Sequence, residues 1–397
     1  MQKEKQLVPK LRFSEFEGEW EKIKLEKICK FFSGGTPTSS NKNFYTGSIP
    51  FIGSGNIFDS KVDKYINEDA LKSSSAKLVE EGDILYALYG ANSGDVSISK
   101  IAGAINQAIL CIRTEENKNF LYQRLSYKKT SIVNTYLQGG QGNLSAKIVK
   151  KISVNFPPLP EQQKIADFLS AVDNRIQNLE KKKELLEQYK KGITQKIFKQ
   201  EIRFKDDDGK AFPEWEEKKL GYYFVERKEK GLENYPLYSL TIEDGVIPKS
   251  KRYEREFLVG DTKDAYKVMY KNDFAFNPMN LRFGALKRFK GDIMINVSKY
   301  YNIFYCNEKG SANFFDYYLT SYNMIQYYNK MATGTLEEKK RVHYHEFIKF
   351  KKLIPSLKEQ IKIANFLSAI DKNIELVNTK IEQTKGYKKG LLQQMFV

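Results

Sequence analysis

Residues 157–198 read PPLPEQQKIADFLSAVDNRIQNLEKKKELLEQYKKGITQKIF, and residues 355–396 read PSLKEQIKIANFLSAIDKNIELVNTKIEQTKGYKKGLLQQMF. The two segments align without a gap at a constant offset of 198 residues, and about half of the aligned residues are identical. The identities include Lys-Ile-Ala at 164–166 and 362–364, and Asp173 with Asp371. An identity of this extent indicates an internal duplication.

Both copies predict a long amphipathic helix. Apolar residues recur every three or four positions, with Lys, Glu, Gln and Asn between them, as in a coiled coil. Prolines at 157, 158, 160 and 355 suit the approach to a helix. A helix of about 38 residues is about 57 Å long, and the other copy is the nearest partner for its apolar stripe. Ordinary core helices are the alternative, but the length and the narrow stripe favour a spacer. The expected stripe is Ile165, Phe168, Val172, Ile176, Leu179, Leu186, Tyr189, Ile193 and Ile197 in the first copy, and Ile363, Phe366, Ile370, Ile374, Val377, Ile381, Leu391 and Met395 in the second.

The regions before the two helices are related more distantly. Arg12-Phe13 and Trp20 resemble Arg203-Phe204 and Trp215. Each region then predicts, in the same order, a strand led by aspartate, a strand with a cysteine, an aromatic helix and a polar loop. These elements are expected at 83–89, 108–112, 117–137 and 138–145 in one region and at 273–276, 303–306, 311–331 and 332–341 in the other.

We call residues 1–156 the first head and residues 201–350 the second head, and the helical spacers are residues 157–200 and 351–397. The predicted fold class is α+β. Two heads are separated by two long antiparallel helices, which form an intramolecular coiled coil with pseudo-two-fold symmetry.

The balance of charge favours a polyanionic partner. The 397 residues include 66 Lys and Arg against 49 Asp and Glu, a net charge of +17. Such an excess is typical of nucleic-acid binding, and a basic protein without such a partner is the alternative. Two unlike basic heads on one spacer would read two different half-sites, in opposite orientations, separated by bases that are not read.

The cysteines and the hydropathy indicate the compartment. Cys29, Cys111 and Cys306 are odd in number and far apart, which argues against a disulfide framework or a zinc cluster. The first ten residues lack the apolar core of a signal peptide, and no run approaches the roughly 20 apolar residues of a membrane span. We therefore expect a soluble, cytoplasmic protein with no membrane association.

Several short motifs are similar to those of one known family. In the first head they are Gly34-Gly35-Thr36-Pro37, Ile-Pro-Phe-Ile at 49–52, Gly-Asp-Ile-Leu at 82–85, Tyr-Gly-Ala at 89–91 and Ile-Asn-Gln at 105–107. The second head matches chiefly at 273–278, and the segments 157–165 and 355–363 match the starts of two conserved regions. Over nearly its full length, the chain resembles the specificity subunits of type I restriction-modification enzymes.

The resemblance implies a function and a set of partners. The heads would be target-recognition domains, each reading one half of a bipartite double-stranded DNA site, and the helices would dock methyltransferase (modification) subunits. Motor-nuclease (restriction) subunits would join the same complex. S-adenosylmethionine and ATP belong to those partners, so the chain is expected to need no cofactor and to be a non-catalytic subunit.

An enzymatic alternative, a self-contained S-adenosylmethionine-dependent DNA methyltransferase, rests on Phe51-Ile52-Gly53-Ser54-Gly55. Such a glycine-rich loop leads directly into a helix, whereas residues 56–60 have turn and strand character. The sequence has neither Asn or Asp followed by two prolines and an aromatic residue nor a Gly-x-x-x-x-Gly-Lys-Ser/Thr loop for ATP. His343 and His345, expected in a loop or at the start of a strand, fit DNA contact or solvent exposure better than metal ligation. A free-standing DNA-binding coiled-coil protein is the third possibility.

Candidate DNA-binding residues are polar side chains in the loops of the heads. Arg pairs with guanine, Asn or Gln with adenine, and other polar groups hold phosphates. Glycines at 139, 140 and 142 would let the backbone approach the duplex. The candidates in the first head are Thr36, Thr38, Ser54, Asn56, Tyr89, Asn92, Gln138, Gln141 and Asn143. Those in the second head are Lys249, Lys251, Arg252, Asn277, Asn280, Arg282, Thr333, Thr335, Lys340, Arg341 and His343.

The remaining basic runs lie on the spacer. The lysines at 181–183 and 190–191 are interpreted as solvated helix faces or as contacts for a partner subunit rather than as a DNA site. Because the long apolar stripes need cover, the chain without partners is expected to be poorly soluble.

Overall fold

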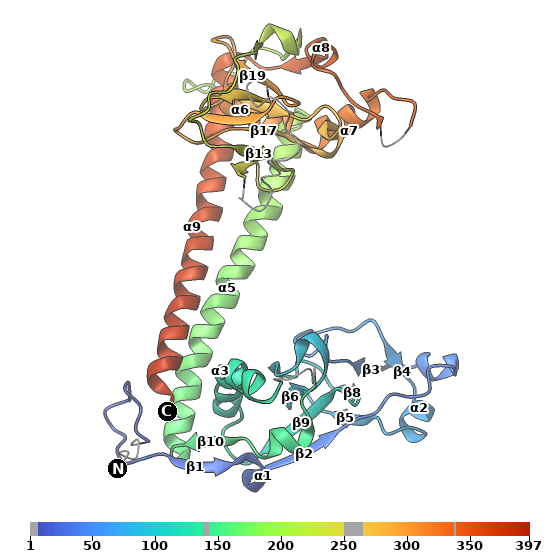
Figure 1. Ribbon diagram of the computed structural model, residues 1–397, viewed down its shortest axis with the longest axis vertical. Helices are drawn as coiled ribbons and strands as arrows, with labels where there is room; N and C mark the ends of the chain where they lie inside the picture. Colours follow the sequence, from blue (N-terminus) through green and yellow to red (C-terminus); the bar gives the residue numbers. More distant parts are fainter. Residues whose placement is uncertain (1–6, 138–142, 250–264, 337–338) are drawn as a thin grey trace. The chain divides into compact units, whose positions relative to one another are not determined.

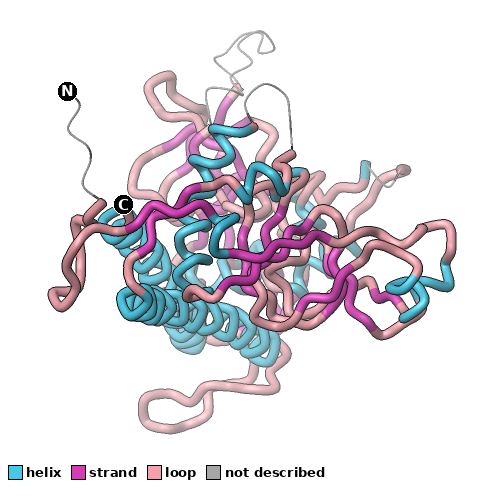
Figure 2. Tube along the Cα trace, turned by 90° about the horizontal axis from the view of Figure 1, so that it is seen from below, coloured by secondary structure: helices cyan, strands magenta, loops and turns pink. Residues whose placement is uncertain are grey.

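The computed structural model describes residues 7–137, 143–249, 265–336 and 339–397 (Figure 1). The chain divides into two compact units: Met1–Glu180 with Thr379–Val397, and Lys181–Asn378. Each unit therefore contains one head and one part of each spacer helix. Helices occur together with sheets whose strands pair mainly in antiparallel fashion (Figure 2), which confirms the predicted α+β class.

The two duplicated segments form single long helices, α5 (Leu159–Phe198) and α9 (Leu357–Met395). Within each unit, contacts between them pair rising residue numbers on one helix with falling numbers on the other. The helices are therefore antiparallel in both units, as predicted. The contacts are Asp173–Lys388 and Glu180–Lys385 in the first unit, and Lys183–Asn378 and Lys190–Asp371 in the second.

The predicted apolar stripe is largely buried, on α9 more completely than on α5. Ile363, Ile370, Val377 and Ile381 are all buried on α9. On α5 the prediction is wrong at Tyr189, which is 51% exposed. A straight helix has 3.6 residues per turn, so a seam that repeats every 3.5 residues on average drifts away from the neighbouring helix along its length.

The first head contains two four-stranded sheets and a separate strand pair, β1 (Glu21–Lys24) with β10 (Ser153–Phe156). One sheet is antiparallel, in the order β2-β9-β6-β7, and the other has the order β4-β3-β8-β5 with β3 and β8 parallel. The strands are β2 (Cys29–Ser33), β3 (Ile49–Ile52), β4 (Tyr65–Ile66), β5 (Lys77–Val79), β6 (Ile84–Ala87), β7 (Val96–Ile98), β8 (Gly103–Ile105) and β9 (Ile109–Thr114). The helices are α1 (Leu25–Ile28), α2 (Glu68–Lys72), α3 (Lys118–Tyr136) and α4 (Ala146–Lys150).

The second head repeats the strand pair and the antiparallel sheet of the first. Its pair is β11 (Glu216–Lys219) with β20 (Lys351–Ile354), and its four-stranded sheet has the order β12-β19-β16-β17. The other strands are β12 (Phe224–Arg227), β13 (Tyr238–Leu240), β14 (Val246–Pro248), β15 (Tyr266–Met269), β16 (Phe274–Phe276), β17 (Leu286–Arg288), β18 (Ile295–Ser298) and β19 (Asn302–Cys306). The duplication therefore extends from the helices into the heads.

The aromatic segment predicted as one helix over 311–331 is two helices, α6 (Ala312–Leu319) and α7 (Tyr322–Met331). The break falls at Thr320 and Ser321. The Thr320 hydroxyl donates to the carbonyl of Asp316, and the Ser321 hydroxyl accepts the N–H of Met324 and caps α7. The prediction of a loop or the start of a strand at His345 is also wrong, because His345 lies in the short helix α8 (Tyr344–Phe347).

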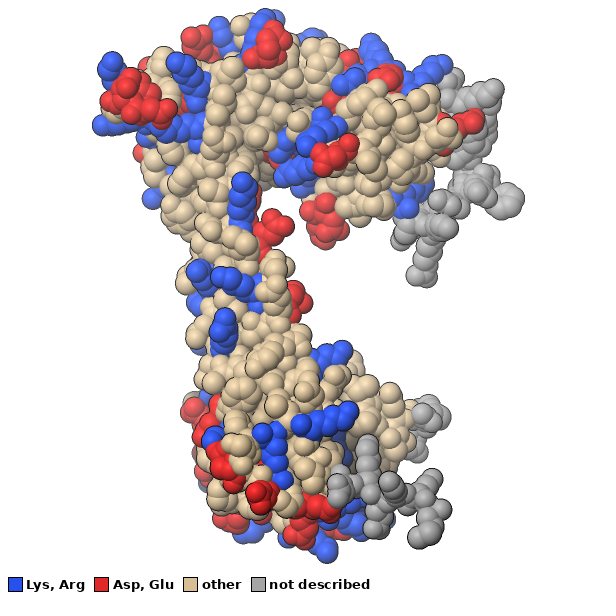
Figure 3. All heavy atoms as spheres, turned by 90° about the vertical axis from the view of Figure 1, so that its left-hand side faces the viewer, with Lys and Arg blue, Asp and Glu red and all other residues tan. Residues whose placement is uncertain are grey.

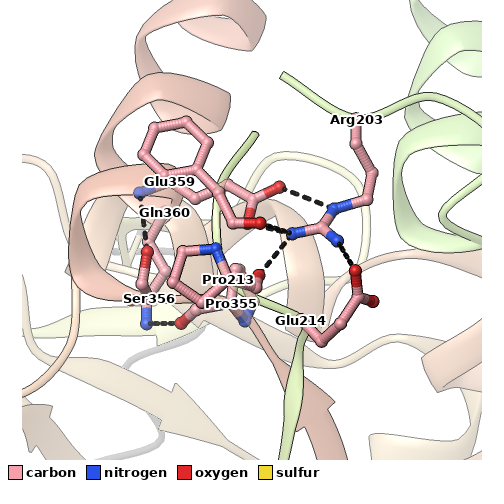
Figure 4. Close-up of polar contacts among 8 residues, drawn as sticks. Arg203, Pro213, Glu214, Pro355, Ser356, Glu359 and Gln360 are labelled. Carbon is pink, nitrogen blue, oxygen red and sulfur yellow. Dashed lines mark hydrogen bonds and ion pairs between the residues drawn. The ribbon is translucent and has the colours of Figure 1, made fainter. Parts of the chain in front are cut away.

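Each head is anchored to the first turn of the helix that follows it by the same contacts. Arg203 binds the fully buried Glu359 through Nε and Nη2, at 3.3 and 3.0 Å (Figure 4). Arg12 binds Glu161 in the same manner, at 2.8 and 2.7 Å. A buried carboxylate requires such a partner because its desolvation is costly. Both anchors join residues that the duplication pairs, so the copies share a way of attaching head to helix.

Candidate nucleic-acid interface

Two loops of the first head meet at the end of β6. One follows β6 (residues 88–95), and the other leads into α4, where residues 143–145 are described. The Leu144 N–H donates to the carbonyl of Leu88 at 2.8 Å, and Tyr89 forms a backbone bridge with Asn143. The side-chain oxygen of Asn143 also accepts the N–H of Gly90 at 3.3 Å. We call these loops the first loop pair.

The second head has an equivalent arrangement, the second loop pair, formed by residues 277–285 after β16 and, before α8, by the described residues 333–336 and 339–343. Val342 donates to the carbonyl of Pro278 at 3.0 Å, which matches the Leu144 to Leu88 bond. Thr333 and Arg341 exchange two backbone hydrogen bonds, both of 3.0 Å. Backbone bonds thus hold the two loops together in each head.

A glycine in the left-handed backbone conformation lies at the end of the first loop of each pair. Gly94 has φ +86° and Gly284 has φ +96°, a conformation that other residues rarely adopt. A Cβ on Gly94 would meet Val133 of α3, and one on Gly284 would meet Ile325 of α7. Each loop pair therefore rests closely on a helix of its own head.

The structure brings together most of the predicted residues of the first head that it describes. Tyr89, Asn92 and Asn143 belong to the first loop pair, and the Asn92 amide donates to the carbonyl of Ser54 at 3.4 Å. Asn56 lies in the same turn as Ser54, with its N–H on the carbonyl of Gly53. Thr36 and Thr38 lie on a separate exposed stretch, where Thr36 is bonded to Gln107 at 2.7 Å. Gln138, Gln141 and the glycines at 139, 140 and 142 lie outside the described residues.

In the second head, the loop pair collects Asn277, Asn280, Thr333, Thr335, Lys340, Arg341 and His343. Arg282 lies in the same loop, in the 3-10 turn η7 (Leu281–Phe283), but its side chain is only 8% exposed and stacks on Phe283 with 4.3 Å to the ring centroid. Lys249 follows β14 and belongs to a different hairpin. Lys251 and Arg252 lie outside the described residues.

Sequence reasoning missed two apolar residues of the second loop pair. Met279 is 43% exposed and Phe283 is 53% exposed. An apolar residue in a sequence is ordinarily assigned to the core, so no local signal marks these two as surface groups. Exposed apolar side chains beside polar ones can contact the methyl group of thymine.

An aspartate directly precedes β6 in the first head and β16 in the second, at the end of the strand opposite the loop pair. Asp83 accepts two hydrogen bonds from Arg113, at 2.9 and 2.7 Å, and one from the N–H of Glu80. Burial tends to raise the pKa of Asp83, but these bonds outweigh it and lower the pKa. Asp273 is bound in the same way by Arg227, which comes from a different strand of the sheet. There burial dominates and raises the pKa of Asp273.

Charged side chains of both signs are mixed on the surface. On the face drawn in Figure 3, Lys and Arg alternate with Asp and Glu on each unit. Of the spacer lysines, Lys181, Lys182 and Lys191 are exposed, as interpreted, whereas Lys183 and Lys190 contact α9. Both the heads and the spacer segments carry a net positive charge, so the charge is not confined to either part of the chain.

The glycine-rich segment after Phe51 has turns and no helix. Strand β3 ends at Ile52, and the residues up to Phe58 form turns, as predicted from the sequence. Over the described ranges, no three His, Cys, Asp or Glu side chains are placed to hold a metal ion together. Among the described helices, none is both long and apolar enough to cross a bilayer.

Comparison with known proteins connects this architecture to one family. Residues 17–188 match the family model described as "Type I restriction modification DNA specificity domain". The chain is 25% identical to the type I restriction enzyme MjaVIII specificity subunit of Methanocaldococcus jannaschii, covering 94% of this chain and 91% of that protein. It is 27% identical to the putative MjaX specificity subunit of the same organism, covering 96% and 94%.

A solved structure shares the fold over the full length. The S subunit of a type I restriction-modification system from M. genitalium superposes with a TM-score of 0.59 at 16% identity, covering 98% of this chain and 99% of that one. The curated relatives are named for the specificity subunit, in line with the prediction of a non-catalytic chain. The chain is therefore similar over nearly its full length to the specificity subunits of type I restriction-modification enzymes, and residues 17–188 match the DNA specificity domain of that family.

Proposed function

We propose that each head reads one half of a bipartite double-stranded DNA site and that the spacer helices hold the two half-sites a fixed distance apart. The observation that carries the proposal is the recurrence of one loop pair, held by equivalent backbone bonds, in both heads. The side chains on the two loop pairs differ, with Tyr89, Asn92 and Asn143 in one and Asn277, Asn280 and Arg341 in the other. Equivalent loops with different side chains suit two different half-sites. In this proposal residues 1–156 and 201–350 read DNA, and residues 157–200 and 351–397 form the spacer.

The spacer helices dock methyltransferase subunits in the same proposal. Tyr189 and Tyr387, which the duplication pairs, are 51% and 57% exposed, and the paired Leu159 and Leu357 are exposed too. Large apolar side chains that recur at equivalent exposed positions suit protein contacts. Motor-nuclease subunits join the assembly, and the partners carry S-adenosylmethionine and ATP. The complex works in the cytoplasm, where its DNA lies.

The test maps methylated bases across a genome in cells that carry the methyltransferase partner, with and without this chain. A single gapped motif that appears only with the chain supports the proposal. Exchange of residues 20–156 for the head of a relative should then change one half of that motif, and exchange of residues 215–350 the other half. Methylation that does not depend on the chain would contradict the proposal. It would favour a free-standing DNA-binding protein.

A further inference from the structure

In each unit, one aspartate of a spacer helix joins three helices. In the first unit, Asp173 of α5 accepts from Lys388 of α9 through Oδ1 and from Gln123 of α3 through Oδ2, both at 2.6 Å. In the second unit, Asp371 of α9 accepts from Lys190 of α5 through Oδ1 at 2.5 Å and from Tyr317 of α6 through Oδ2 at 2.6 Å. We call these two groups of residues the aspartate joints.

The duplication pairs the spacer members of the joints but not the head members. Asp173 corresponds to Asp371, and Lys190 corresponds to Lys388. The head contributes an amide, Gln123, in one unit and a phenol, Tyr317, in the other. The shared requirement is therefore a hydrogen-bond donor on the head helix. The spacer offers the same carboxylate to two unlike heads.

The joints supply a directional contact that apolar packing lacks. Burial of apolar surface depends on area and only weakly on angle, whereas a charge-assisted hydrogen bond is sensitive to distance and direction. The donors are themselves held in place, because Gln123 is buried and the Tyr317 ring lies 5.2 Å from Lys190 Nζ. If a head turned about its own helix pair, the donor would leave the Oδ2 of its aspartate.

We propose that the two aspartate joints fix the orientation of each head on its helix pair and so determine how strictly the chain selects the number of unread base pairs between the half-sites. The inference rests on the proposed bipartite reading. One additional base pair moves a half-site by about 3.4 Å and turns it by about 35° about the DNA axis. A head with a loosened joint reaches the displaced half-site more easily than a head with a fixed one.

The experiment measures methylation rates of the complex of the full chain with its methyltransferase subunits. The substrates are duplexes that carry the mapped motif with its native gap, or with one base pair removed or added. Tyr317→Phe deletes the hydroxyl that bonds both Asp371 and Ser368 of α9, and Asp371→Ala removes the shared carboxylate of the joint. We expect the preference for the native gap to fall about fivefold in either variant, the size typical of a part-exposed ion pair or hydrogen bond. The bases selected within each half-site should not change.

A matched control removes an ion pair of the spacer that does not involve a head. Glu180→Gln removes the carboxylate charge that pairs with Lys385. This ion pair joins α5 to α9 and involves no residue of a head. This variant should keep the gap preference of the wild-type chain. The corresponding change in the first unit, Gln123→Leu, should lower the preference for the native gap as Tyr317→Phe does.

Two results would overturn the inference. One is an unchanged gap preference in Tyr317→Phe and Asp371→Ala. The other is an equal loss of rate on all three gaps, because that loss indicates a purely structural role. If the wild-type chain confers no gapped motif at all, the proposed function fails, and the inference fails with it. That failure is recognised from the wild type alone, before any variant is made.

Discussion

At the scale of single residues, the second loop pair contains the sharpest candidate for DNA contact. Arg341 is half-buried, and its backbone is fixed by two bonds to Thr333. We expect Arg341→Ala to lower the rate of methylation of the cognate site by a factor that corresponds to about 1–3 kcal/mol of lost DNA-binding free energy. If Arg341 reads a base, specificity should relax at one position of the second half-site only. Lys349→Ala, an exposed lysine of the same head outside the loop pair, is the control. Equal rates in the two variants would remove Arg341 from the interface.

The buried residues Asp83 and Asp273 give a prediction about pH. The lowered pKa of Asp83 means that its ion pair stabilises the first unit fully above the ordinary carboxyl pKa of about 3.9, and that this contribution is lost as the pH falls through the lowered value. Asp83→Asn should therefore lower the free energy of unfolding by about 2 kcal/mol at pH 7, with a smaller difference below pH of about 4. Asp273→Asn should lower the free energy of unfolding by less. Burial raises the pKa of Asp273, so its charged form contributes less stability.

Each unit contains one of the two tryptophans, so the two effects can be measured separately. Trp20 reports on the first unit in a Trp215→Phe background, and Trp215 reports on the second in a Trp20→Phe background. Denaturant unfolding followed by fluorescence gives the two free energies. Identical costs for the two aspartates at pH 7 would contradict the assignment.

At the scale of the elements, the long helices contain glycines that their own packing does not require. Gly192 of α5 and Gly390 of α9 are paired by the duplication, and a Cβ on either would meet nothing within 4 Å. Glycine inside a helix is less favourable than alanine by about 1 kcal/mol. We therefore expect Gly192→Ala and Gly390→Ala each to stabilise its unit by about 0.5–1 kcal/mol in the same fluorescence measurement.

Gly284→Ala is the matched control for these helix variants. Its φ of +96° is unfavourable for alanine, and a Cβ there would lie 3.3 Å from Ile325. This variant should be less stable than the wild type. Loss of stability in Gly192→Ala would instead mean that another group packs against that glycine.

At the scale of the whole molecule, the exposed apolar residues of the spacer predict self-association of the chain without partners. Tyr189, Tyr387, Leu185 and Leu376 are all more than half exposed. In sedimentation velocity, the isolated chain should form larger species as its concentration rises. The double variant Tyr189→Ser with Tyr387→Ser should shift the distribution toward monomer, and so should the methyltransferase partner. A wild-type chain that stays monomeric at high concentration would contradict the prediction.

The sequence alone was sufficient to predict the duplication, the two long helices, the α+β class and the resemblance to type I specificity subunits. Each of these depends on local spacing or on matching residues, and both can be recognised along the chain. The same holds for the aspartate-led strands, which the structure places at β6 and β16. The loop candidates were chosen from residue type alone, and their contacts with DNA stay a prediction.

The tertiary structure alone decided which of these residues meet. Residues 88 and 144 are bonded although 56 positions separate them, and no local pattern encodes that contact. The burial of Arg282, the exposure of Phe283 and Tyr189, and the break at Thr320 likewise depend on what packs against each residue. The same holds for the aspartate joints. In the sequence, each aspartate resembles a solvated residue of a helix. Only the fold brings a lysine of the other helix and a donor of the head to its two oxygens.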